Sequence, residues 1–95
     1  MADKEAFEQK HEAKIEEMQA EIDRLKAKAK QAEADSKVKY QERISELEAL
    51  KAKADEKLEI MKKSSKDAWT DVSTGLESAT QSLATAIKAA SKEFK

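Results

Sequence analysis

The chain has 95 residues, so its length accommodates at most one domain. Charged residues make up 41% of the sequence and aromatic residues only 4%, which excludes a conventional globular core and is typical of a coiled coil or a long helix. The net charge is −1, from 19 basic and 20 acidic residues, which excludes a polybasic nucleic-acid-binding protein.

Residues 1–63 form the first predicted element, a highly charged coiled-coil rod. Apolar and small side chains recur along it at an average spacing of about 3.6 residues, and this regularity argues against disorder. Such a stripe gains most of its stability by packing on another helix, so the rod predicts a homo-oligomer. The expected contacts between copies are the large aliphatic residues of the stripe: Ile15, Ile22, Leu25, Ile44, Leu47 and Leu58.

The charge pattern changes across residues 62–67. Ser64 followed by Asp67 resembles the start of a new helix, because serine is a good N-cap and an acidic residue suits the first turn. A bend here would fold residues 67–94 back onto about residues 35–62. Against a bend, the apolar stripe keeps its phase across the segment, which contains neither glycine nor proline. An unbroken helix and a hairpin therefore both stay open.

Residues 64–95 form the second predicted element, an amphipathic helix rich in serine and threonine and low in charge. Between residues 70 and 87 only Asp71 and Glu77 are charged, and seven residues are serine or threonine. Bulky apolar residues opposite such a face are typical of a helix that lies in a membrane interface by hydrophobic insertion rather than by attraction to anionic lipid. The expected anchors to a membrane or another hydrophobic surface are Trp69, Val72, Leu76, Leu83, Ile87 and Phe94.

The same C-terminal stripe would serve equally well as the contact face of a helical bundle. A purely soluble coiled-coil scaffold or adaptor is therefore the alternative function. Gly75 lowers helix stability by roughly 1 kcal/mol relative to alanine, which favours a helix that folds on binding. The two functions can coexist, because a helix protected in an oligomer can be released to a lipid surface.

No catalytic, metal or cofactor site is expected. His11 is the only histidine and the chain has no cysteine, so neither a zinc site nor a Ser-His-acid arrangement can be assembled. A single glycine excludes a loop that cradles phosphate. The basic residues between Arg24 and Lys30 alternate around the helix and form no continuous stripe. We therefore expect a non-enzymatic protein that binds neither nucleic acid nor a small-molecule substrate.

The sequence also bears on cellular location. No stretch is apolar enough to span a bilayer, and the charged N-terminus lacks the apolar segment of a secretory signal. The expected location is therefore the cytoplasm, with peripheral attachment to a membrane if the C-terminal helix binds lipid.

Three stretches of sequence carry a resemblance to other proteins. They are residues 21–29, the segment 32–35 with Tyr40 after it, and most specifically the run Asp-Ala-Trp-Thr-Asp at 67–71 followed by Gly75. In these stretches the chain resembles small bacterial coiled-coil-domain proteins, which are generally described as of unknown function. The high serine and threonine content that follows departs from that family pattern, in which more charge is expected.

The general pattern of the chain is also similar to that of exchangeable apolipoproteins, whose amphipathic helices coat lipid; this second likeness is one of pattern alone. Neither resemblance implies catalytic or binding residues. The sequence therefore predicts an all-α protein, either a long amphipathic helix or an unequal helical hairpin, that assembles as a coiled-coil or helical-bundle oligomer.

Overall fold

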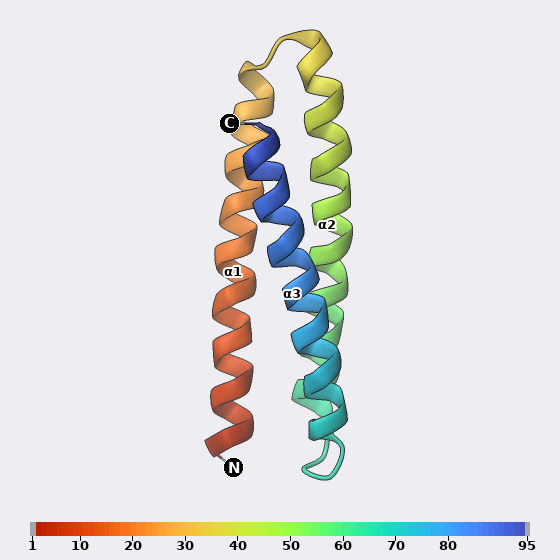
Figure 1. Cartoon of the computed structure of the whole chain (residues 1–95). Coiled ribbons are helices and arrows are strands. Elements are labelled where there is room, and N and C mark those ends of the chain that lie inside the picture. Colours follow the sequence, from red (N-terminus) through yellow and green to blue (C-terminus); the bar gives the residue numbers. More distant parts are fainter. Residues whose placement is uncertain (1, 95) are drawn as a thin grey trace.

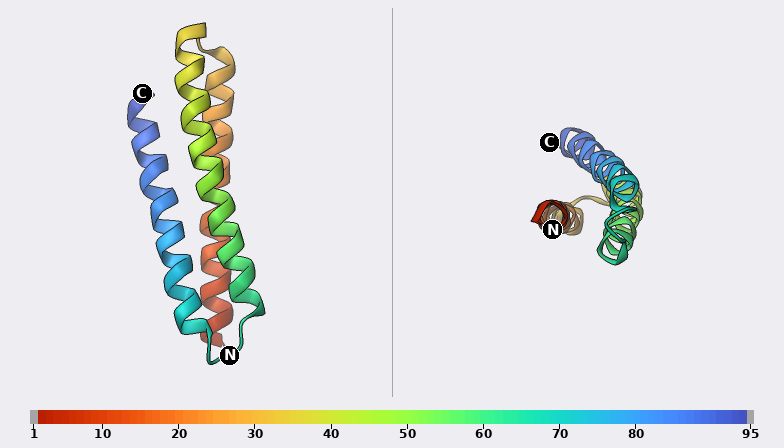
Figure 2. Two further views of the ribbon diagram at one scale, coloured as in Figure 1. Left: turned by 90° about the vertical axis from the view of Figure 1, so that its right-hand side faces the viewer. Right: turned by 90° about the horizontal axis from the view of Figure 1, so that it is seen from below.

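The computed structural model describes residues 2–94, with side chains from Lys4 onward, as three packed α-helices (Figure 1). Helix α1 spans Ala2–Gln31, α2 spans Ala34–Lys63 and α3 spans Trp69–Glu93. The chain runs up, down and up, so α1 and α3 are parallel and α2 is antiparallel to both (Figures 1 and 2). The predicted all-α class is confirmed as an elongated three-helix bundle with extents of 51 × 18 × 17 Å.

The buried positions follow the heptad spacing that is typical of helical bundles. In α3 they alternate in steps of three and four residues, a spacing that keeps the buried side chains on one face of the helix. The buried residues of α3 are Ser73, Leu76, Thr80, Leu83, Ile87 and Ala90. Those of α2 are Tyr40, Ile44, Leu47, Ala54, Leu58 and Met61. Each helix thus turns one apolar stripe toward the shared axis of the bundle.

The core consists of two apolar clusters stacked along this axis. The upper cluster lies toward the α1–α2 turn and includes Leu47 and Leu83. The lower cluster lies toward the α2–α3 turn and includes Met61 and Leu76. All four side chains are at most 1% exposed, so one chain forms a buried core by itself, which the composition was expected to exclude.

Both turns of the bundle are made without left-handed backbone. Glu33, before α2, has φ −71° and ψ 160°, and Ser64, after α2, has φ −75° and ψ 146°. Their φ values are close to those of a helix, so only ψ departs from helical geometry. No residue in the described part of the chain has a positive φ. Each helix break therefore needs no glycine, and ordinary residues are sufficient.

The hairpin arrangement is the one adopted at residues 64–68, where the helix stops after Lys63 and α3 returns along α2 (Figure 2). The break at Ala32–Glu33 was not predicted, and it divides the expected rod into α1 and α2. The physical reason is tertiary packing: folding α1 against α2 buries the stripes of both helices, which an extended single helix would leave in water. Among the described residues, none of the helices combines the length and apolar character needed to cross a membrane.

Candidate functional site

The apolar stripe of α3 is folded inward. Leu76 and Leu83 are fully buried and Ile87 is 7% exposed. Trp69, Val72 and Phe94 are half-buried and pack on the edges of the two clusters. All six residues that the sequence assigns to a hydrophobic surface thus share one face of α3, and that face covers the α1–α2 pair.

Aromatic contacts hold the two ends of α3. At its N-terminal end, the ring of Trp69 meets Phe7 of α1 edge-on, with centroids 6.0 Å apart. At its C-terminal end, the ring of Phe94 stacks on Tyr40 of α2, with centroids 3.9 Å apart. Aromatic pairs of this kind add modestly to the free energy of burial. The outermost anchors of α3 are therefore the ones that begin to reach the surface of the bundle.

Two hydroxyl groups lie within the α3 stripe, but neither bonds to another helix. The Ser73 hydroxyl donates a 2.7 Å hydrogen bond to the carbonyl oxygen of Thr70. The Thr80 hydroxyl donates a 2.7 Å hydrogen bond to the carbonyl oxygen of Leu76. Both bonds stay inside α3 and would survive its separation from the bundle. Polar groups at core positions thus satisfy themselves locally and do not fix α3 to its neighbours.

We expect Thr80→Val to raise the free energy of unfolding by about 1 kcal/mol, and the Tm by roughly 4–8 °C. The side chain is 4% exposed, and valine fills the same space without burying a hydroxyl. Thermal denaturation followed by circular dichroism measures the change. Thr74→Val is the matched control, because the Thr74 hydroxyl makes the same kind of bond to Thr70 but is exposed. An equal gain in both variants would contradict this explanation.

Ion pairs join α1 to α2 more often than they join either helix to α3. The Lys26 ammonium lies 2.8 Å from a Glu48 carboxylate oxygen, and the Lys62 ammonium lies 2.9 Å from a Glu12 carboxylate oxygen. Hydrogen bonding to these carboxylates raises the pKa of each lysine. Lys4 also donates to the carbonyl oxygen of Ser64, at 2.8 Å. Exposed pairs of this kind stabilise only weakly, so they add little to the apolar packing of α1 on α2.

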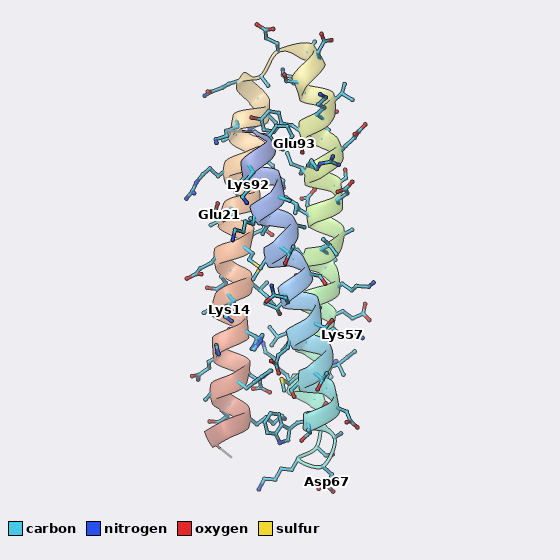
Figure 3. The ribbon with its side chains drawn as sticks, in the orientation of Figure 1. Lys14, Glu21, Lys57, Asp67, Lys92 and Glu93 are labelled. Atoms are coloured by element: carbon cyan, nitrogen blue, oxygen red, sulfur yellow. The ribbon has the colours of Figure 1, made fainter. Side chains whose placement is uncertain are left out.

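Within residues 4–94, one ion pair joins α3 to the other helices. Arg43 Nε donates to Glu93 Oε1 at 2.7 Å, which raises the pKa of the arginine. Arg43 also contacts Glu46 on its own helix, at 3.1 Å. Glu93 lies near the C-terminal end of α3, where Figure 3 labels it. Helix α3 is therefore held chiefly by apolar contacts, with a single exposed pair at one end.

A surface groove of ≈ 610 Å³ runs between α1 and α3. Lys14 and Glu21 line it from α1 (Figure 3), and Thr80, Ala84 and Ile87 line it from α3. Helix α3 packs more extensively on α2 than on α1, and the groove lies on its less covered side. The lining mixes charged side chains with apolar ones, and His11 also lines it. The groove marks the side on which α3 is held least.

His11 is buried in the bundle and is 4% exposed. Its ring stacks on Phe7, with centroids 4.2 Å apart, and its Nδ1 lies 3.1 Å from the carbonyl oxygen of that residue. Within the described part of the chain, no group of three or more His, Asp or Glu side chains converges as a metal site would require. The histidine is thus part of the packing between α1 and the start of α3.

The six residues expected at contacts between copies lie inside the chain's own core. Each is at most 9% exposed, and they are divided between the two clusters: Ile15, Ile22, Leu25, Ile44, Leu47 and Leu58. Folding within one chain is sufficient to bury them, and their role between copies stays a prediction. In the described part of the chain, the exposed large apolar side chains are Val38 and Ile60, which the sequence analysis did not select.

The hydroxyl residues of the core were also missed from the sequence. A search for apolar residues selects Val72 and Ala79, whereas Ser73 and Thr80, one position later, are the buried residues. Counting steps of three and four residues back from Leu76 and Leu83 would have identified them. Comparison with protein-family models, curated proteins and solved structures finds no match to this chain.

Proposed function

We propose that the protein is a non-enzymatic helical bundle whose α3 leaves the bundle and binds membrane surfaces reversibly. The observation that carries the proposal is the way α3 is held: a complete apolar stripe is attached through apolar contacts and one exposed ion pair. A lipid interface offers the same stripe an equivalent apolar environment. The protein would then attach peripherally to the membrane, and α3 would return to the bundle when lipid is removed.

The polar side of α3 favours this exchange over binding to an anionic surface. Its outward residues include Thr74, Ser78, Ser82 and Thr85, all exposed and uncharged. A helix of this kind enters defects in lipid packing and depends little on lipid charge. The separated α1–α2 pair keeps its own contacts, including the Lys26–Glu48 ion pair. Release of α3 is thus a partial opening of the protein and leaves the other two helices joined.

Opening has a cost that sets the conditions for binding. Removing α3 from the bundle exposes Leu47 and Met61, which are now covered. Binding shifts the closed–open equilibrium only if lipid stabilises the open form by more than this cost. We therefore expect strong binding to small, highly curved phosphatidylcholine vesicles and weak binding to large, flat ones.

The experiment that tests the proposal locks α3 in place. Arg43→Cys and Glu93→Cys in one chain, joined by a short bismaleimide, link α2 to the C-terminal end of α3. We expect the unmodified protein to float with small phosphatidylcholine vesicles and the linked variant to stay in solution. The chain contains no other cysteine, so the link is specific.

The matched control carries Arg43→Cys and Glu46→Cys, which lie on the same helix and accept the same reagent without joining two helices. This control is expected to float like the unmodified protein. Flotation of the locked variant at the level of the control would exclude release of α3 as the mechanism.

A soluble scaffold is the second candidate function. The observation that favours it is that a single chain covers the middle of the α3 stripe, where Leu76 and Leu83 are fully buried. A protein that never associates with vesicles of any curvature would support this function, and its partners would then be other proteins.

A further inference from the structure

The turn between α2 and α3 is nearly a helix already. Ser64 has a helical φ of −75° and leaves the helix only through its ψ of 146°. Its hydroxyl donates to the carbonyl oxygen of Ile60, four residues earlier, as serine often does inside helices. The carbonyl oxygen of Ser65 accepts hydrogen bonds from the backbone N–H groups of Ala68 and Trp69. The turn therefore keeps part of the hydrogen bonding of a helix, and the ψ of Ser64 is an angle that must change to make the helix continuous.

The turn contains no residue that an α-helix excludes. Residues 64–68 contain neither glycine nor proline, and no described residue of the turn has a positive φ. Leu58 and Leu76 are 18 positions apart, which is about five turns of an α-helix, so both would lie on one face of the continuous helix. An extended α2–α3 helix would thus present one unbroken apolar stripe.

In the extended form, α3 is carried away from its own α1–α2 pair. Its stripe then has no partner within the chain, and the groove left on the α1–α2 pair is empty. The α3 stripe fits the face of an α1–α2 pair that α3 covers in the closed bundle, where Leu76 packs with Ile15, Leu58 and Met61. A second copy of the chain in the same extended form presents that surface.

We propose that two copies of this protein exchange α3, each docking it on the α1–α2 pair of the other. In this dimer α2 and α3 form one helix, and the contacts that α3 makes with the α1–α2 pair in the closed bundle are made between copies instead of within one. The α1–α2 pair, with its Lys26–Glu48 and Lys62–Glu12 ion pairs, stays within each copy. The dimer requires no lipid and stands independently of the proposed membrane binding.

The test uses two single-cysteine chains, Arg43→Cys and Glu93→Cys. These positions face each other between α2 and α3 in the closed bundle. The two variants are mixed, unfolded together, refolded at high concentration without lipid, and treated with a short bismaleimide. Exchange of α3 brings position 43 of one copy beside position 93 of the other. The expected product is a covalent 43–93 dimer, at least tenfold more abundant than 43–43 dimers, since two closed monomers provide no such pairing.

Two substitutions of Ser65, in the turn between α2 and α3, are expected to shift the monomer–dimer equilibrium in opposite directions. Ser65→Pro suits the closed turn, because Ser64 already has the extended ψ that a residue before proline prefers, and no backbone bond from the Ser65 N–H is present. Inside a continuous helix the same proline is strongly disfavoured, so the dimerisation constant should fall at least about 100-fold. Ser65→Ala removes a poorer helix former and should raise the dimer fraction.

Light scattering after size-exclusion chromatography measures both variants at equal concentration. A 43–93 dimer no more abundant than the 43–43 dimer would overturn the proposal. So would a dimer that persists unchanged in Ser65→Pro while Ser65→Ala has no effect. Failure of vesicle flotation would bear on membrane binding alone, because every step here is carried out without lipid.

Discussion

Replacing Leu76 with aspartate is expected to unfold the bundle. The side chain is fully buried in the lower cluster, among Ile15, Leu58 and Met61. The substitution removes an apolar side chain and places a carboxylate where it has no partner. The expected loss exceeds about 4 kcal/mol, a large part of the stability of a domain of this size. Circular dichroism and urea denaturation should show loss of the cooperative transition.

The matched control is Ser78→Asp, two positions along α3, which adds the same charge at an exposed site. It is expected to change the free energy of unfolding by less than about 0.5 kcal/mol. A folded Leu76→Asp protein with a normal transition would mean that α3 contributes little to the bundle. A stripe that is exposed in the free protein would behave in this way.

The apolar stripes could be predicted from the sequence, whereas what they pack against could not. Ile22 and Leu47 were selected because they recur at helical spacing, and both are buried. Periodicity identifies the side chains that are shielded from water. It does not distinguish burial within one chain from burial between copies, because either would shield the same side chains. The stripe therefore predicts a core without stating how many chains supply it. A three-helix bundle and a coiled-coil oligomer satisfy the same pattern.

The first turn shows why helix breaks are hard to locate. Ala32 and Glu33 lie in the break, although alanine and glutamate are both residue types that favour helices. The φ of Glu33 is close to that of a helix, and only its ψ of 160° is not. No local signal is required, because the break is favoured by the distant contacts that form when α1 folds onto α2. The second turn carried a weak signal in Ser64 and Asp67, and the structure does break the helix there. Ser64 is the C-cap of α2, however, and α3 begins after Ala68 without a side-chain cap.

Two leucines of the upper cluster provide a matched pair of variants for the vesicle-binding experiment. Leu47 lies on α2 and Leu83 on α3, they belong to the same cluster, and each is at most 1% exposed. Truncation of either to alanine is expected to lower the free energy of unfolding by about 2–5 kcal/mol. The two variants thus loosen the bundle by similar amounts but differ in which helix loses an apolar side chain.

For lipid binding the two substitutions have different consequences. Leu47→Ala weakens the closed form and leaves the stripe of α3 intact, so release is easier and vesicle affinity should rise. Leu83→Ala weakens the closed form but also removes an anchor that contributes about 2 kcal/mol in the lipid-bound state. We therefore expect Leu47→Ala to bind small phosphatidylcholine vesicles about thirtyfold more tightly than Leu83→Ala does.

Titration of each variant with vesicles, followed by Trp69 fluorescence, measures the two affinities. Trp69 is half-buried against Phe7 in the bundle, so its environment changes when α3 leaves. Equal affinities would mean that vesicle binding depends only on how far the bundle is destabilised, and that α3 is not the specific lipid-binding helix. Tighter binding by Leu83→Ala would mean that the α1–α2 pair, rather than α3, meets the lipid. Only tighter binding by Leu47→Ala identifies α3 as the lipid-binding element. The side chain of Leu47 contributes to the cost of opening alone, whereas that of Leu83 also contributes to insertion of α3 into lipid.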